Sequence, residues 1–364
     1  MKHFVFFALL LMIFLLVVPT ILVVGFSNDE PGLTTYETEQ TDEQPPLITG
    51  EPEEVEHIAV FRSEEEIIEE VPFEDYIAGV VASEMPATYE MDALKAQALT
   101  ARTYIMQLLT TGSDINLPDG ANVTDTVMHQ VFKNEEELNE EWGSEYEWKM
   151  ARVKQAVYET SGKIITYNGE PITAAYFSTS NGYTENSEEY WSNEFPYLRS
   201  VESPWDVDSP RYEGETVMSV QEFEQKLEVT IDSGPPGEIL SRTTGGRVAK
   251  AEIGGVEFTG REVRDLLDLD SSDFQWERQG NMISIETKGW GHGVGMSQYG
   301  ADQMAKEGYD YEEIILHYYQ NVEIEEAEDV LGLIIAHQNR SSEEEEDETE
   351  EQESSSEQQA LGNQ

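Results

Sequence analysis

A glutamate on the apolar face of a helix is the first feature that could do chemistry. Ile77 and Val80 recur at helical spacing, and Glu84 continues the same apolar stripe. Pro86 disfavours helix at the residue before it, so the helix should end close to Glu84. Desolvation and the negative end of the helix dipole would both raise the pKa of a carboxyl group there. A carboxyl group that stays protonated near neutral pH suits general acid catalysis.

A second helix is expected to begin at Met91, and it carries two basic residues on one face. Lys95 and Arg102 are seven residues apart, which is about two helical turns. They could orient Glu84 or hold a polar substrate. Two alternatives stay open. Either Lys95 or Arg102 forms a structural salt bridge with Glu84, or both basic residues belong to a solvated face of the helix.

A glycine-rich stretch, GWGHGVGMSQYGA, covers residues 289–301. It lacks the lysine of a phosphate-binding loop and the βαβ context of a dinucleotide fingerprint, and one histidine is no zinc site. Trp290 could stack on a sugar ring, and Ser297 and Gln298 could form hydrogen bonds with it. The alternative is a tight turn in which His292 caps backbone groups.

An aromatic loop, FSTSNGYTENSEEYW at residues 177–191, combines hydroxyl groups, amides and aromatic rings. With Tyr197 and Trp205 close by, this composition suits carbohydrate binding. An ordinary polar loop is the alternative.

The elements that must position these residues are helices and small hairpins. Strand patterns cover 55–62 and 239–259, and hairpins are predicted at 163–177 and 274–287, with turns at Asn168-Gly169 and Gly280-Asn281. Helices are predicted at 73–85, 91–109, 148–160, 220–227, 262–267, 297–306 and 311–319. The expected fold is α+β, with helices beside small antiparallel hairpins and a substrate groove between two lobes.

Composition bounds the class of protein and its location. The chain has 364 residues, with 75 acidic and 21 basic residues and a formal charge of −54, which disfavours nucleic-acid binding. It has no cysteine, so disulfides and thiol chemistry are excluded. Lys2 precedes an apolar run from Phe4 to Phe26, long enough to span a hydrocarbon core of roughly 30 Å. We expect an uncleaved anchor at 1–27, a flexible acidic linker at 28–54, a catalytic domain at 55–325 and a disordered acidic tail at 340–364.

Three motifs together resemble one known family. SEMPATYEMDALKAQALTARTY, FSTSNGYTE and GWGHGVGMSQYGA look like the stage II sporulation protein D family, which is related to modifier proteins of bacterial wall amidases. The resemblance covers about residues 55 to 321. It implies a single-pass membrane protein with a cytoplasmic N-terminus. The implied activity is that of an extracytoplasmic lytic transglycosylase, which cuts peptide-stripped peptidoglycan during the engulfment step of endospore formation, in the mother-cell membrane.

The resemblance also implies roles for individual residues. It makes Glu84 the catalytic acid and points to substrate contacts by Lys95, Arg102, Tyr197, Ser297 and Gln298. The relatives carry lysine where this chain has Arg199, so a basic group is kept there. We also expect substrate contacts from Trp290, His292 and Tyr299. The implied partners are glycan strands, a sporulation amidase and a membrane protein of the engulfment machinery.

No cofactor is expected. Some relatives bind structural zinc through Cys and His before the third helix, but here only His129 remains in that stretch, so no zinc is expected.

Two other functions stay open beside the transglycosylase. A non-catalytic module could bind glycan and activate or tether an amidase. A hydrolase could use water with a second acid such as Glu185 or Asp206.

Overall fold

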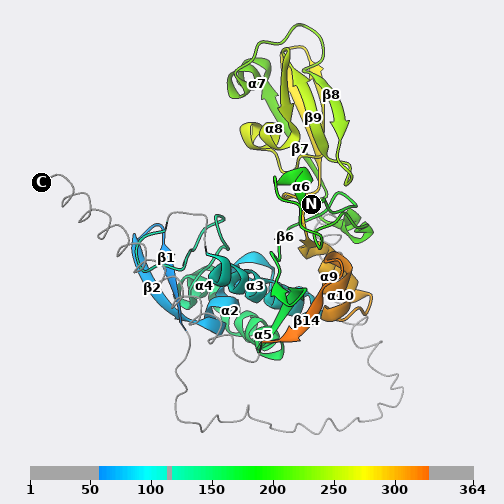
Figure 1. Ribbon diagram of the computed structural model, residues 1–364. Coiled ribbons are helices and arrows are strands. Elements are labelled where there is room, and N and C mark those ends of the chain that lie inside the picture. Colours follow the sequence, from blue (N-terminus) through cyan, green and yellow to red (C-terminus); the bar gives the residue numbers. More distant parts are fainter. Residues whose placement is uncertain (1–56, 113–116, 328–364) are drawn as a thin grey trace, which may run out of the picture. The chain divides into compact units, whose positions relative to one another are not determined.

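The computed structural model describes residues 57–112 and 117–327, and they form an α+β fold with small sheets, as predicted (Figure 1). The expected anchor, linker and acidic tail lie outside the described residues. Among the residues that are described, no helix is both long and apolar enough to cross a membrane.

The described chain opens with a small sheet that leads directly into the first helix. Strand β1 (His57–Arg62) pairs antiparallel with β2 (Ile67–Pro72), and the short β3 (Val123–Thr124) lies parallel on the other side of β1. The strand at 57–62 was predicted, whereas β2 was not. Because β2 is an edge strand with half of its residues exposed, its acidic sequence shows no clear alternation.

Three long helices form the first core. Helix α2 (Phe73–Glu84) packs on α3 (Met91–Thr111) and α5 (Tyr146–Glu159). Its apolar stripe is buried, with no exposed area on Ile77, Val80 or Val81. The three helices lie close to the predicted ranges. Helix α4 (Glu135–Trp142) was not predicted, because Leu138 is its only buried residue and the rest of its sequence is mostly acidic.

A second sheet and two C-terminal helices complete this core. Strands β14 (Glu323–Glu326), β4 (Lys163–Tyr167) and β5 (Glu170–Pro171) form a sheet, and α9 (Gln298–Lys306) and α10 (Tyr311–Tyr318) pack against α3. The hairpin turn at Asn168-Gly169 is present, and both of its residues have positive φ.

The predicted second strand of that hairpin was wrong beyond Pro171. Instead, β6 (Tyr176–Phe177) pairs parallel with β13 (Met296–Ser297) of the glycine-rich loop. A long-range pair of this kind leaves no local signal in the sequence.

Residues 213–288 build a second core. Two antiparallel sheets, in the orders β10-β9-β8 and β11-β12-β7, pack with two helices around a separate apolar cluster (Figure 1). The elements are β7 (Glu213–Ser219), α7 (Val220–Leu227), β8 (Glu238–Arg242), β9 (Val248–Ile253), β10 (Val256–Thr259), α8 (Gly260–Leu267), β11 (Phe274–Gln279) and β12 (Met282–Lys288). The hairpin predicted at 274–287 and the helix at 220–227 are confirmed.

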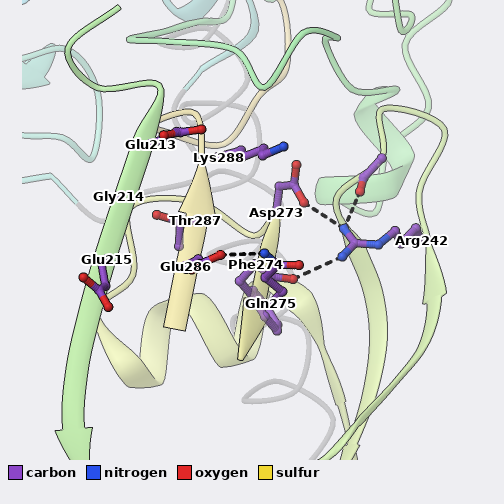
Figure 2. Close-up of a pocket in the computed structure, with 11 residues that line it drawn as sticks. Glu213, Gly214, Glu215, Arg242, Asp273, Phe274, Gln275, Glu286, Thr287 and Lys288 are labelled. Atoms are coloured by element: carbon purple, nitrogen blue, oxygen red, sulfur yellow. Dashed lines mark hydrogen bonds and ion pairs between the residues drawn. The ribbon is translucent and has the colours of Figure 1, made fainter. Parts of the chain in front are cut away.

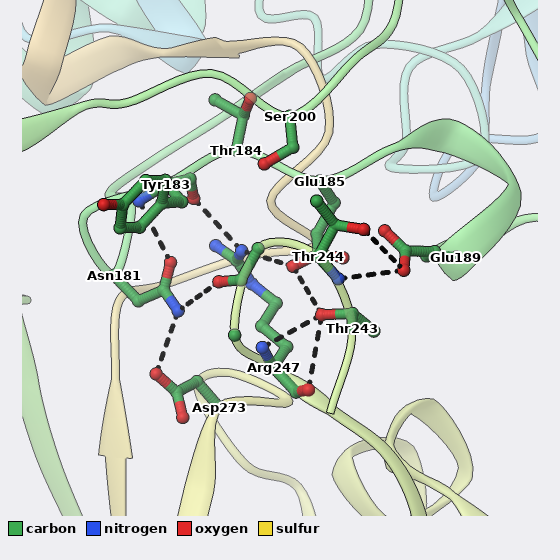
Figure 3. Close-up of polar contacts among 12 residues, drawn as sticks. Asn181, Tyr183, Thr184, Glu185, Glu189, Ser200, Thr243, Thr244, Arg247 and Asp273 are labelled. Carbon is green, nitrogen blue, oxygen red and sulfur yellow. Dashed lines mark hydrogen bonds and ion pairs between the residues drawn. The ribbon is translucent and has the colours of Figure 1, made fainter. Parts of the chain in front are cut away.

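The aromatic loop carries polar contacts to the second core (Figure 3). Arg247 Nη1 lies 3.0 Å from Glu185 Oε1, and both side chains are almost fully buried. Asn181 donates to Asp273 at 2.9 Å. Loop residues that the sequence suggested for carbohydrate therefore also hold the two cores together.

Candidate functional site

A cleft of about 590 Å³ opens at the C-terminal end of α2. Residues 82–89 form one wall, and the other walls come from helices α4, α5 and α9 and from two loop segments. The side chains that bear on its chemistry are Glu84, Tyr89, Glu141, Trp142, Lys149, Ser178, Arg211, Gln298 and Tyr299. None of its lining residues belongs to the second core at 213–288, so this cleft is not the groove between two lobes that we expected.

Glu84 is the last residue of α2, as the apolar stripe and Pro86 predicted. Its Oε1 accepts a hydrogen bond from the Val131 backbone N–H at 3.0 Å. Burial raises the pKa of the Glu84 carboxyl above its ordinary value, and hydrogen bonds from Val131 and the Tyr176 phenol offset only part of that rise. The carboxyl group therefore tends to keep its proton at higher pH than an exposed glutamate does.

The glycine-rich loop contacts the helix end that carries Glu84. The Gln298 side-chain amide donates to the Glu84 backbone carbonyl at 3.0 Å and to Gln97 Oε1 at 3.3 Å. Tyr299 meets Tyr89 edge to face, with ring centroids 6.3 Å apart. The structure thus brings together three of the predicted site residues, Glu84, Gln298 and Tyr299, in one cleft.

Lys95 and Arg102 do not line this cleft. Arg102 is fully buried, and its guanidinium forks onto Glu74 and the Thr160 carbonyl. Lys95 pairs with Glu159 at 2.5 Å. Neither forms the salt bridge with Glu84 that was the structural alternative, and neither points a free cation at it. Both join α3 to neighbouring helices, so their geometry fits a structural role.

Tyr197 and Arg199 also lie away from the cleft lining. The Tyr197 hydroxyl accepts from the Thr173 backbone N–H at 3.0 Å, and its ring stacks on Phe195. Arg199 forms two hydrogen bonds with Glu188, at 2.8 and 2.6 Å.

His292 forms the backbone cap that was the alternative to a binding role. Its Nδ1 accepts from the Val294 backbone N–H at 3.0 Å, and its ring packs against Phe177, Tyr190 and Trp191. Burial lowers its pKa to about 3, and nearby arginines add to the effect, so the imidazole is neutral at physiological pH.

Ser297 is fully buried and caps α9, with its hydroxyl also donating to Asp206 at 2.6 Å. Asp206 accepts further hydrogen bonds from Ser180 and Ser203. Burial raises the pKa of the Asp206 carboxyl above its ordinary value despite these bonds. The cluster locks the start of α9, and with it the position of Gln298.

The two acids considered for a hydrolase are both outside the cleft. Asp206 belongs to the serine cluster and Glu185 to the buried pair with Arg247. The only other carboxylate that lines the cleft is Glu141, which is about half exposed and pairs with Lys133. Glu141 lies in the acidic helix α4, so nothing in its local sequence singles it out.

Sequence reasoning missed the cations of the cleft. Lys149 lies near the rings of Trp142 and Trp148, with Nζ 5.4 and 5.7 Å from their centroids. Arg211 lies over the exposed Trp290 ring, with Cζ 4.7 Å from its centroid. Through Arg211, Trp290 adjoins the cleft without lining it. No spacing rule links a loop arginine at 211 to a tryptophan at 290.

No group of three or more His, Asp or Glu side chains suited to a metal ion occurs within residues 57–112 and 117–327. The His129 Nδ1 accepts from the Thr124 backbone N–H at 3.1 Å. The absence of zinc therefore stays a prediction, to be tested by metal analysis.

A second pocket, of about 740 Å³, lies in the second core along β7, β11 and β12 (Figure 2). Its Arg242 is committed to Asp273 at 2.7 Å and to backbone carbonyls. None of the predicted site residues lines this pocket.

Comparison with known proteins identifies the family. A model of the stage II sporulation protein family matches residues 62–167. The chain is 45% identical over 341 residues to stage II sporulation protein D of Bacillus subtilis (strain 168), covering 92% of this chain and 99% of that protein. The chain belongs to the stage II sporulation protein D family. The family member from Bacillus amyloliquefaciens is 46% identical over 345 residues, with the same coverage of both chains.

The matched residues 62–167 include α2, α3 and Glu84. The present chain is also 30% identical over 301 residues to the amidase enhancer of Bacillus subtilis (strain 168). The match covers 67% of the present chain and 39% of the amidase enhancer. The resemblance that the three motifs suggested is therefore confirmed, including the relation to amidase modifiers.

Proposed function

We propose that this protein is a lytic transglycosylase that cuts peptidoglycan glycan strands between N-acetylmuramic acid and N-acetylglucosamine. The observation that carries the proposal is Glu84, a carboxyl group with a raised pKa at the edge of an open cleft. A raised pKa lets a general acid keep its proton at higher pH than an exposed glutamate does. The cleft also offers the aromatic and amide side chains that suit sugar rings, Tyr89, Tyr299 and Gln298.

One carboxyl group is enough for this reaction. Glu84 donates its proton to the glycosidic oxygen, the bond to C1 of the muramic residue breaks, and positive charge develops at that carbon. The Glu84 carboxylate then takes the proton of the same sugar's C6 hydroxyl, whose oxygen attacks C1 and closes a 1,6-anhydro ring. Glu84 ends protonated and no water is consumed, in contrast to hydrolysis with two carboxylates.

The hydrogen bonds around Glu84 suit both of its roles. The Val131 N–H and the Tyr176 phenol stabilise the carboxylate, whereas burial stabilises the neutral acid. Burial is the larger of the two effects, and the hydrogen bonds offset part of the rise in pKa that it causes. That balance favours a group that gives a proton and takes one back.

The cellular setting is part of the proposal. We infer that residues 1–27 anchor the protein in the mother-cell membrane with the domain outside the cytoplasm, where it acts on peptide-stripped glycan during engulfment. An amidase that removes stem peptides and a membrane protein of the engulfment machinery are the proposed partners. Membership of a sporulation family supports this setting.

The test is product analysis on peptide-free glycan strands. The ectodomain is compared with Glu84→Gln, and products are identified by mass spectrometry. We expect 1,6-anhydromuramic ends from the wild type and none from the variant. Glu141→Gln serves as the matched control, because it removes the other carboxylate that lines the cleft. New reducing ends that depend on both residues would instead establish a hydrolase.

A second candidate is a glycan-binding module that activates a wall amidase. Similarity to a protein named amidase enhancer favours it. In that case neither wild type nor Glu84→Gln would cut glycan, and both would bind it and stimulate the amidase equally.

A further inference from the structure

The candidate cleft departs from the charge balance of the whole chain. Acids outnumber bases 75 to 21 overall. The charged residues that line the cleft are two acids, Glu84 and Glu141, and two bases, Lys149 and Arg211. Their formal charges cancel when Glu84 is ionised, and protonation of Glu84 leaves a net positive charge. Distant surface acids are screened beyond a Debye length of about 8 Å at physiological salt, so a bound ligand senses these local charges and nearby acids such as Asp206 and Asp302, which act on Tyr89.

Arg211 is the cleft cation that stays available. Lys149 pairs with Glu145 at 2.9 Å. Within the described part of the chain, no carboxylate forms an ion pair with Arg211, although most other cations there are paired. Burial raises the pKa of the Asp270 carboxyl, and the charges of Arg264 and Arg211 offset only part of that rise. Arg211 and Asp270 form no hydrogen bond with each other.

The Arg211 guanidinium is held in place from two sides. One face lies against the Trp290 ring, with Cζ 4.7 Å from its centroid, and Nη1 lies 3.4 Å from Ser178 Oγ. Trp290 is itself fixed by two backbone hydrogen bonds with Thr179, at 3.1 and 2.8 Å. A planar guanidinium held in this way loses little freedom when it binds a carboxylate with two parallel hydrogen bonds.

We propose that Arg211 binds the free lactyl carboxylate of a muramic residue and so selects the substrate; this rests on the proposed function. Of the two sugars of the glycan strand, only muramic acid carries a carboxylate. That carboxylate is free only where the amide bond to the stem peptide has been cut. Amide hydrolysis must therefore supply the substrate of this site. A strand with its peptides attached offers a neutral amide there. The amide oxygen can accept a hydrogen bond, but it cannot form an ion pair with a guanidinium.

The experiment measures binding rather than cleavage, so it does not depend on the chemistry of Glu84. Glu84→Gln ectodomain is titrated with peptide-free strands, and with the same strands after carbodiimide coupling of their lactyl carboxylates to methylamine. The two ligands differ only in the charge and hydrogen bonding of that group. The measurements are repeated with Arg211→Gln and Arg211→Lys in the same background.

We expect the carboxylate strands to bind at least tenfold more tightly than the amidated strands, as for the loss of a charged hydrogen bond. Arg211→Gln should abolish this ratio and leave binding of the amidated strands unchanged. Arg211→Lys should restore part of it, because charge returns without the planar fork. The preference should also shrink with added salt.

Arg278→Gln is the matched control. Arg278 is a half-buried arginine of β11 whose guanidinium donates to the backbone carbonyls of Gly280 and Asp232, and it does not line the cleft. Its replacement should leave the ratio unchanged. Equal affinity of Glu84→Gln for both ligands, or equal loss of both ligands in Arg211→Gln, would overturn the assignment of Arg211. Absence of cleavage by the wild type, with the binding ratio intact, would count against the transglycosylase and not against Arg211.

Discussion

Arg62 is a buried charged residue whose removal should disturb the segment that supports Glu84. It is 4% exposed and contacts three carboxylates, those of Asp125 at 3.1 Å, Glu69 at 2.9 Å and Glu137 at 2.5 Å. These bonds join β1 to β2, to the loop after β3 and to α4. The segment between residues 125 and 137 contains Val131, the backbone donor to Glu84. Arg62 therefore holds both ends of the segment that supports the candidate acid.

The expected cost of Arg62→Met follows from the exposure of each partner. Methionine keeps the buried apolar stem of the side chain. Glu69 and Glu137 are 32% and 39% exposed, so water can hydrate them once the arginine is gone. Asp125 is only 12% exposed and would lose its ion pair, keeping the hydrogen bond from the Ser63 backbone N–H at 3.1 Å. Removing one partner of a buried pair costs 3–5 kcal/mol, and since only one acid is left buried, we expect about 3 kcal/mol.

The assay is equilibrium unfolding of the purified protein in urea. The matched control is Lys250→Met, which removes an ion pair with Glu257 whose side chains are 55% and 54% exposed. That change should cost no more than about 1 kcal/mol. Added salt should recover part of the loss in Arg62→Met, because it screens the repulsion among the three acids. A loss as small as that of the control would refute the view that this cluster anchors the segment.

The remaining predictions concern protonation, backbone geometry and metal content. The rate of cleavage should fall as pH rises through the raised pKa of Glu84. Tyr176→Phe should move that fall to higher pH, because the Tyr176 phenol lowers the pKa of Glu84. Profiles of kcat/KM against pH measure both effects. The folded protein holds the Glu84 proton more tightly than the unfolded chain does, so Glu84 lowers the free energy of unfolding as pH rises from its ordinary to its raised pKa. Above that pH window Glu84→Gln should be more stable than the wild type, and below it the two should be equally stable. Urea unfolding at both pH values measures the difference. Gly293→Ala should cost about 1–3 kcal/mol in the same assay, because φ is +87° and the added Cβ would overlap the Arg247 guanidinium. Gly280→Ala, at φ +63° with open space around it, should cost only about 1 kcal/mol. Elemental analysis of the purified ectodomain should find no stoichiometric zinc; zinc at one per chain would contradict the expectation drawn from the missing cysteines.

Local periodicity predicted the elements that carry their own signal. The apolar stripe and Pro86 were enough to place Glu84 at the end of a buried helix. Most other helices and two hairpin turns also followed from spacing and turn residues. The elements missed include the edge strand β2, helix α4 and the strand β7, whose exposed faces carry acidic residues and weaken the apolar pattern.

The partners of each charged residue were decided by tertiary structure. A period tells which face of a helix a side chain occupies, but not which distant element packs against that face. Arg102 meets Glu74 rather than Glu84, and Gln298 reaches the Glu84 carbonyl across 214 residues of sequence.

Local sequence was therefore enough to predict the candidate acid, its helix and the motifs of the family, because these depend on neighbours a few residues apart. Only the tertiary structure brought Arg211 into the cleft that Glu84 lines, with Trp290 against it, and paired Arg102 with Glu74 instead. Contacts between distant segments arise from the packing of whole elements, and no local spacing encodes them.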